Sequence, residues 1–87
     1  MYTPVYTKQF GKDTKRCVRR GKNMDKFKIL VPALLSGKPL DPIHRDHKLS
    51  GNLVGRRDCH IESDWVLVYR VEGSKLIFER MGTHSDL

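Results

Sequence analysis

The chain has few cysteines and no long apolar run. These two features argue against a disulfide-rich protein and against a membrane protein. The two cysteines, Cys17 and Cys59, do not form a C-x-x-C pair. We therefore expect free thiols in a reducing compartment and no disulfide framework. No apolar run approaches the roughly 18 residues of a membrane span, and the first ten residues lack the apolar core of a signal peptide. We expect a cytoplasmic protein without a membrane partner.

The sequence also lacks internal repeats, low-complexity segments and room for a second domain. At 87 residues, the chain is near the lower size at which a protein buries a core without disulfides or metals. Most of its apolar residues must therefore pack in that core. We expect one domain over residues 1–87.

Basic residues are abundant and unevenly distributed. The net charge is +7. Residues 1–44 hold ten Lys and Arg against three acidic residues, whereas residues 45–87 hold seven against seven. A basic excess points to a polyanionic partner such as a nucleic acid. The ionisable groups of the balanced second half are expected to pair with one another, which separates binding from chemistry along the chain.

A first helix is predicted from Thr7, a good N-cap residue, to Gly21, a good C-terminal stop. Side chains at helical spacing are expected to face the core: Phe10, Thr14, Cys17 and Val18. Basic side chains occupy the other faces, and four are candidates for phosphate contacts: Lys12, Lys15, Arg16 and Arg19. The alternative is that this basic face is merely solvated.

A second helix is predicted between Asn23, its N-cap, and Ser36–Gly37, its stop. Its inward positions are Met24, Phe27, Leu30, Val31, Leu34 and Leu35. Pro32 removes a backbone donor and is expected to kink the helix. The two helices together predict a helical hairpin.

The remaining pattern is typical of β-structure. A short β-prone segment opens the chain at residues 2–6, and three segments rich in β-branched and aromatic residues follow the helices, at residues 56–62, 65–71 and 75–81. The sequence "EGS" at residues 72–74 predicts a tight hairpin, and hence an antiparallel meander. The order predicts an α+β fold.

Strand alternation groups polar side chains on this meander. Asp58, His60 and Glu62 are expected on one face, with Asp64 and Trp65 beside the end of that strand. In the last strand, a shared face is predicted for three residues, Leu76, Phe78 and Arg80.

Three ordered signatures carry a resemblance to a known family. They are D-H-x-L-x-G ("DHKLSG", residues 46–51), R-[DE]-x-H-[IV]-x-x-D-x-[LV]-[LI]-[VI]-Y (residues 57–69) and R-x-G-[ST]-H-[SA]-x-L (residues 80–87). The chain resembles the RelE superfamily of bacterial toxins, and most closely its YafQ branch. The first 39 residues match in pattern alone. The family's last signature usually continues to an aromatic residue, whereas this chain stops at Leu87.

The resemblance implies a RelE-like microbial RNase fold, β-α-α-β-β-β, with an antiparallel sheet packed against a helical hairpin. It implies an mRNA endonuclease that acts in the ribosomal A site with 16S rRNA contacts and without a cofactor. It also implies the toxin half of a toxin–antitoxin pair. An acidic antitoxin would neutralise it, and operator DNA would be contacted through the antitoxin complex alone.

The positions that match the family's catalytic residues are His47, His60, Asp64, Arg80 and His84. Metal-independent RNA cleavage needs a base for the 2′-hydroxyl, an acid for the 5′-oxygen and stabilisation of the phosphorane. We expect His84 to be the acid, Asp64 and His47 to form the base side, and Arg80 to hold the phosphate. His60 would orient a neighbour or polarise the phosphate. Trp65 is an edge-of-core aromatic or stacks on a base. His44, off the matched positions, is left as a loop residue.

Other interpretations remain at this point. Asp46 and Asp58 beside the histidines, and Glu79 beside Arg80, would form ordinary surface ion pairs. A zinc site would use His44, His47, Cys59 and His60, although adjacent strand residues point to opposite faces. A non-catalytic RNA- or DNA-binding module and a catalytically decayed toxin are further alternatives.

Overall fold

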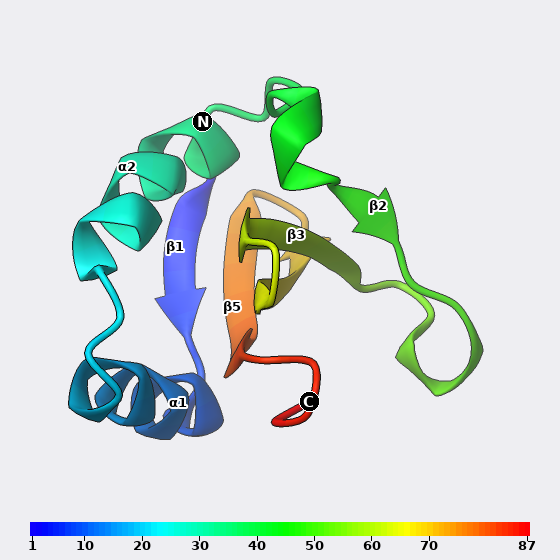
Figure 1. The fold of residues 1–87 in the computed structure, drawn as a ribbon. Coiled ribbons are helices and arrows are strands. Elements are labelled where there is room, and N and C mark those ends of the chain that lie inside the picture. Colours follow the sequence, from blue (N-terminus) through cyan, green and yellow to red (C-terminus); the bar gives the residue numbers. More distant parts are fainter.

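Two α-helices pack on a five-stranded mixed sheet in the computed structural model, which describes residues 1–87 (Figure 1). The elements are β1 (Thr3–Tyr6), α1 (Lys8–Arg19), α2 (Met24–Leu35), β2 (His47–Lys48), β3 (Arg57–Glu62), β4 (Trp65–Glu72) and β5 (Lys75–Gly82). Short 3₁₀ turns lie at Pro42–His44 and Gly51–Leu53. Neither helix has the length and hydrophobicity of a membrane span. The α+β fold class is confirmed.

The sheet has the strand order β1-β5-β4-β3-β2. The antiparallel meander of β3, β4 and β5 is confirmed. Two details differ from the prediction. β1 pairs with β5 in parallel, so the sheet is mixed, and β2 adds a two-residue strand beside β3. A segment as short as β2 carries no alternation from which it could have been predicted.

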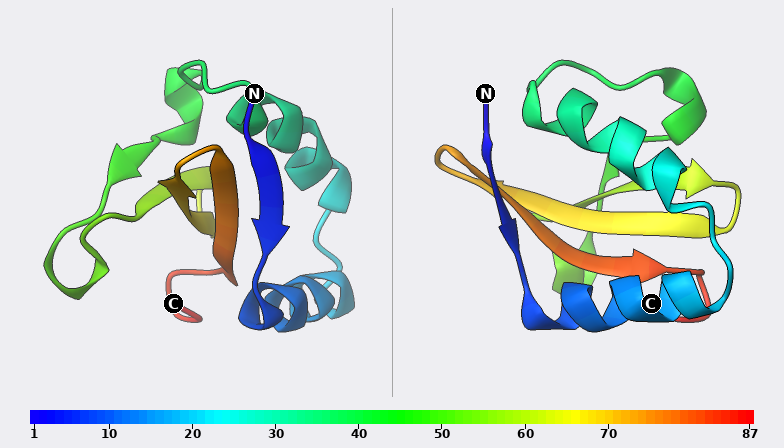
Figure 2. Two further views of the ribbon diagram at one scale, coloured as in Figure 1. Left: turned by 180° about the vertical axis from the view of Figure 1, so that it is seen from behind. Right: turned by 90° about the vertical axis from the view of Figure 1, so that its left-hand side faces the viewer.

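The helices begin and end where the capping residues predict. The Thr7 hydroxyl accepts a hydrogen bond from the backbone N–H of Phe10 (3.0 Å), and the Asn23 side chain accepts one from that of Asp25 (3.1 Å). Gly21, at φ +76°, reverses the chain after α1. α2 continues through Pro32 to Leu35. The helices run in roughly opposite directions, as in a hairpin (Figure 2).

The buried face of α1 differs from the prediction at two positions. Phe10 and Cys17 are buried as expected, but Val18 is 57% exposed and Asp13 is completely buried. The inward stripe is therefore Phe10, Asp13 and Cys17. The carboxylate of Asp13 faces inward because it accepts a hydrogen bond from the backbone N–H of Met81 in β5.

Trp65 is also fully buried, with 0% exposure, in the core between the helices and the sheet. Around it lie Phe10, Cys17, Phe27, Leu30, Leu34, Cys59, Ile61, Leu67, Tyr69, Leu76, Phe78 and Met81. The prediction that Trp65 contacts RNA is wrong, since an enclosed indole ring presents no face to a base. Its packing role is the one that the structure supports.

A bulge at Glu79 changes the side-chain pattern of β5. Tyr69 pairs with Phe78, whereas the preceding residue of β4, Val68, pairs with Arg80, so one extra residue lies between them. Met81, and not Arg80, therefore takes the core position after Phe78. The predicted shared face of Leu76, Phe78 and Arg80 is wrong for this reason.

Candidate active site

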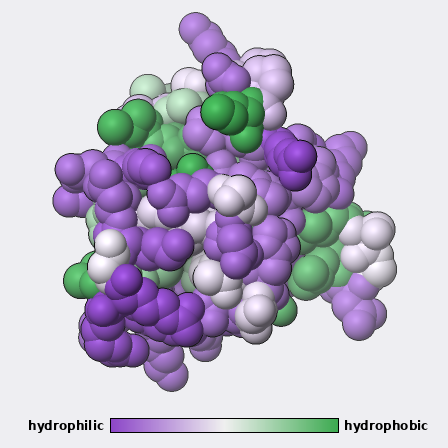
Figure 3. Space-filling model, viewed as in Figure 1, coloured by the Kyte–Doolittle hydropathy of each residue, from purple (hydrophilic) through white to green (hydrophobic).

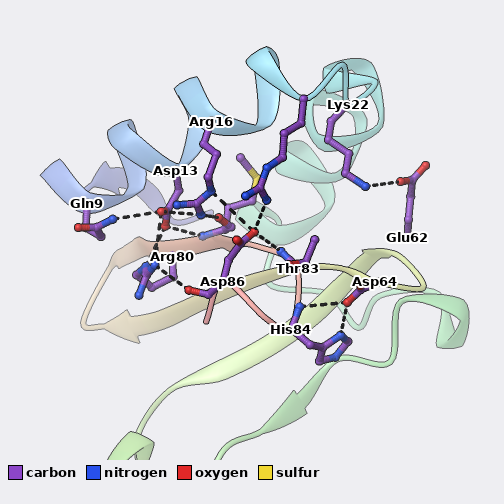
Figure 4. A network of polar contacts seen from close by, with 12 residues as sticks. Gln9, Asp13, Arg16, Lys22, Glu62, Asp64, Arg80, Thr83, His84 and Asp86 are labelled. Atoms are coloured by element: carbon purple, nitrogen blue, oxygen red, sulfur yellow. Dashed lines mark hydrogen bonds and ion pairs between the residues drawn. The ribbon is translucent and has the colours of Figure 1, made fainter.

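Asp64, in the turn between β3 and β4, binds His84 in the segment that follows β5 (Figure 4). Its Oδ1 accepts hydrogen bonds from the backbone N–H of His84 (3.0 Å) and from ring atom Nδ1 (2.5 Å). These bonds lower the pKa of Asp64 below its usual value, so the carboxylate is ionised at neutral pH. The proton is therefore held on Nδ1 of His84, and Nε2 is left free. Asp64 thus contacts the predicted acid rather than the other predicted base, His47.

His60 lies beside this pair. Its ring centroid is 5.4 Å from that of His84, and its Nδ1 is 3.2 Å from the carbonyl oxygen of Ser63. Because a carbonyl accepts and does not donate, Nδ1 carries the proton and Nε2 is again free. Three of the predicted catalytic residues, His60, Asp64 and His84, therefore form one group.

His47, on β2, has the same arrangement at a distance from that group. Its Nδ1 lies 2.6 Å from the carbonyl oxygen of Arg45 and 3.1 Å from Oδ1 of Asp58. The carbonyl again places the proton on Nδ1, which leaves the Nε2 lone pair available to accept a proton. Arg45 adopts a left-handed conformation, at φ +49°, at the turn that brings this carbonyl to the ring.

The pairing register relates His47 to Arg80 across the sheet. His47 pairs with Asp58, Asp58 with Val68, and Val68 with Arg80. With neighbouring strands about 4.8 Å apart, the two backbones are separated by roughly 14 Å. The row two residues further along β3 runs from His60 through Val66 to Gly82. The predicted catalytic residues therefore surround a short stretch of sheet rather than one point.

Arg80 binds Asp13 of α1, and not its sequence neighbour Glu79. Its Nε donates to Oδ2 of Asp13 (2.8 Å), and its Nη2 lies 3.3 Å from the carbonyl oxygen of Asp86. Nη1 has no protein partner, and the side chain is 36% exposed. Glu79 instead binds Arg56 and Arg70. The anticipated Arg80–Glu79 ion pair does not form, because each side chain has other partners.

Asp13 is a residue that sequence reasoning missed. Its carboxylate accepts hydrogen bonds from the backbone N–H of Met81 (3.0 Å), from Arg16 (2.9 Å) and from Gln9 (3.1 Å), in addition to Arg80. Burial raises its pKa, but the hydrogen bonds from Arg80 and Met81 outweigh burial and lower it overall. The available signal was a single acidic residue in a basic helix, three residues after the inward Phe10 and four before Cys17.

The segment that carries His84 is tied to α1 through Asp86. The Asp86 carboxylate binds Arg20 (2.6 Å) and the backbone N–H of Thr83 (2.9 Å). The hydrogen bond from Arg20 is the main cause of a strongly lowered Asp86 pKa. Gly82 permits this approach, since an added Cβ would lie 2.8 Å from Asp86 and 2.9 Å from Arg16.

The predicted phosphate-binding residues of α1 divide into two groups. Lys12, Lys15 and Arg19 are exposed and take part in no ion pair. Arg16 is different, because its Nη2 donates to the carbonyl oxygen of Met81 (3.1 Å) as well as to Asp13. That Arg16 also contacts rRNA stays a prediction, although Nη2 of its guanidinium is engaged within the protein. The face of the molecule seen in Figure 3 is mostly hydrophilic.

A cavity of about 720 Å³ adjoins His60 and Asp64. Its other lining residues include Lys22, Lys26, His44, Arg45 and Glu62. His44 is more than a loop residue here, because its Nδ1 lies 2.8 Å from the carbonyl oxygen of His60.

The four residues of the zinc alternative do not meet. Cys59 is fully buried among core residues, and burial raises its thiol pKa to about 12. His60 is its neighbour in β3 and points to the other face. No group of three His, Cys, Asp or Glu side chains has a geometry that could hold a metal ion.

Comparison with known proteins identifies the family of the chain. The profile of a family described as the bacterial toxin of type II toxin–antitoxin systems, YafQ, matches residues 2–87. The mRNA interferase toxin YafQ of Escherichia coli K12 is 42% identical over 83 residues, which are 94% of this chain and 90% of the relative.

Solved structures agree as well. The toxin in the E. coli DinJ–YafQ complex superposes with a TM-score of 0.92 at 40% identity, covering 100% of this chain and 98% of the other. A metal-bound toxin from Helicobacter pylori gives 0.92 at 36% identity, covering 100% and 99%. Fold, site and comparisons together define the class as a toxin of a type II toxin–antitoxin system. The chain belongs to the YafQ toxin family.

Proposed function

We propose that this chain is an endoribonuclease toxin that cuts translated mRNA in the ribosomal A site and thereby inhibits translation. The observation that carries the proposal is the Asp64–His84 pair, in which a carboxylate holds Nδ1 and leaves Nε2 free. The name of the 42% identical E. coli relative, an mRNA interferase, gives the substrate class.

In the proposed reaction, Nε2 of His47 takes the proton of the 2′-hydroxyl. The 2′-oxygen then forms a bond to phosphorus, and the bond from phosphorus to the 5′-oxygen breaks as His84 donates its Nε2 proton to that oxygen. Asp64 acts through His84, because its carboxylate holds the Nδ1 proton, so the second proton that the acid form carries lies on Nε2 and faces the leaving oxygen. Arg80 stabilises the phosphorane through its free Nη1, and His60, which lies against His84, helps to orient that ring. The products would carry a 2′,3′-cyclic phosphate and a 5′-hydroxyl. The reaction requires no cofactor.

Ribosome binding is assigned to the exposed basic side chains of α1, Lys12, Lys15 and Arg19, which would contact phosphates of 16S rRNA. We propose further that a small acidic antitoxin neutralises the toxin in the cytoplasm. Support comes from the E. coli relative, which was solved in complex with DinJ, and from the net charge of +7. Operator DNA would be contacted through that complex alone.

Primer extension on mRNA from cells that express the chain tests this function. Wild-type protein should produce cuts within translated reading frames, and the His84→Gln variant at equal abundance should not. Co-expression of the adjacent reading frame, if it encodes a small acidic protein, should suppress the cuts. The proposal would be contradicted if cells that express the wild-type protein grew normally and their mRNA showed no new 5′ ends.

A further inference from the structure

We propose that Asp13 of α1 is a positioning residue that aims the guanidinium of Arg80 at the scissile phosphate. The proposal rests on the proposed function, because it assigns to Arg80 the task of holding that phosphate. It adds a residue from the first half of the chain to a site otherwise built from the second half.

The contacts of the Asp13 carboxylate leave little freedom to Arg80. Oδ2 accepts from Nε of Arg80 (2.8 Å) and from the backbone N–H of Met81 (3.0 Å). The same carboxylate atom therefore fixes both the guanidinium and the backbone of the residue that follows it. Oδ1 accepts from Arg16 and Gln9, at 2.9 Å and 3.1 Å. With 0% exposure, the carboxylate touches no solvent and cannot itself reach a substrate.

The geometry of the guanidinium then determines which N–H groups of Arg80 are left to bind RNA. The carboxylate and the Asp86 carbonyl hold Nε and Nη2 of Arg80 (Figure 4). Nη1 is the nitrogen without a protein partner, and the 36% exposure of the side chain gives it access to solvent. A guanidinium is planar, so fixing one edge fixes the direction of the remaining N–H groups. A flexible Arg80 would have to be oriented by the substrate at each turnover.

An ionised carboxylate suits this role better than the amide of the same size. Asp13→Asn would keep the volume but replace one acceptor oxygen with an NH₂ donor. That donor would face N–H groups of Arg80 and Met81 or of Arg16 and Gln9, whichever way the amide turned. The variant should therefore retain the fold at reduced stability while Arg80 loses its fixed orientation.

A double-mutant cycle tests the proposal. Wild type, Asp13→Asn, Arg80→Ala and the double variant are compared for cleavage of mRNA on programmed ribosomes, with rates expressed per folded molecule. Asp13→Asn should lower kcat at least tenfold and leave KM for ribosomes within twofold. In the Arg80→Ala background, Asp13→Asn should have no further effect on kcat. An equal loss in both backgrounds, or an unchanged kcat, would overturn the proposal.

Glu79→Gln is the matched control. Glu79 belongs to β5, as Arg80 does, and like Asp13 it binds two arginines, here Arg56 and Arg70. It should lose stability and keep kcat; a kcat loss equal to that of Asp13→Asn would contradict a specific role for Asp13.

Nuclear magnetic resonance gives a readout that is independent of cleavage. The Nε–H signal of Arg80 should be shifted and slowly exchanging in wild type, and should collapse to solvent-like behaviour in Asp13→Asn. If it persists, the positioning proposal fails even where cleavage is seen. If wild type cuts no mRNA, the proposed function fails, and this signal still decides whether Asp13 orients Arg80.

Discussion

A single carboxylate oxygen of Asp64 accepts hydrogen bonds from both the backbone N–H and the ring Nδ1 of His84. The turn between β3 and β4 thereby fixes both the position and the tautomer of a histidine 20 residues further along the chain. This contact predicts how the loss of the Asp64 carboxylate affects cleavage.

Asp64→Asn should reduce cleavage without unfolding the domain. The amide of Asn would hold the Nδ1 proton of His84 more weakly than the carboxylate does, so the ring would be less firmly aimed at the leaving oxygen. We expect a loss of roughly 10- to 100-fold, a part of the 10²–10⁴-fold that a positioned proton-transfer group supplies. Single-turnover cleavage on ribosomes measures it, with thermal melts as the control. Both residues are more than half exposed, so wild-type stability is expected.

Removal of a reacting group should have a larger effect. His84→Gln, His47→Ala and Arg80→Ala should each lower the cleavage rate by roughly 10²-fold or more. His44→Gln is the control, because its ring supports the carbonyl of His60 and takes no part in proton transfer. Losses that merely track the unfolded fraction, measured by circular dichroism, would show that these residues form a salt-bridged scaffold instead.

Acid should destabilise the domain through its paired carboxylates. Asp13, Glu79 and Asp86 all have lowered pKa values, each with hydrogen bonds from arginine among the causes. A lowered folded-state pKa gives stability that is present above the unfolded value, about 4, and is lost as pH falls towards the folded value. The urea concentration at the unfolding midpoint should therefore decrease as the pH is lowered from 6 to 3. The decrease should be smaller in Asp86→Asn. A midpoint that is independent of pH would contradict the ion pairs.

Salt dependence should separate the two groups of basic residues on α1. Replacing Lys12, Lys15 and Arg19 with Gln should flatten the dependence of ribosome affinity on salt, with a change in slope of about 0.7–0.9 for each phosphate that is no longer neutralised. The control replaces three other exposed lysines, Lys28, Lys38 and Lys75. Equal flattening by both sets would indicate a general effect of net charge. Arg16→Gln should instead lower stability, because its partners are Asp13 and Met81.

Local features of the fold were predictable because local residues determine them. Thr7, Gly21 and Asn23 cap the helices as their chemistry requires. The predicted strand boundaries of the meander agree with the structure to within one residue. The candidate catalytic residues came from the family signatures rather than from periodicity, and the fold brings three of them, His60, Asp64 and His84, together.

The features that were missed depend on contacts between distant segments. The bulge at Glu79 moves Arg80 out of the alternation, and no residue type in "FERM" indicates it. Asp13 is buried because β1 pairs with β5 only as far as Phe78, so the backbone of Met81 must find its hydrogen bonds on α1. A sequence pattern does not reveal that side chains of a helix will form hydrogen bonds with the backbone of a distant strand.

The most direct test of this account uses purified protein and one mRNA in three forms: free, bound to ribosomes, and bound to ribosomes with a 2′-deoxynucleotide at the cut site. We predict that the ribosome-bound RNA is cut to leave a 5′-hydroxyl, while the free RNA and the deoxy form survive. Cleavage of the deoxy form, a 5′-phosphate on the product, or equally fast cleavage of free RNA would contradict attack by the 2′-hydroxyl on the ribosome.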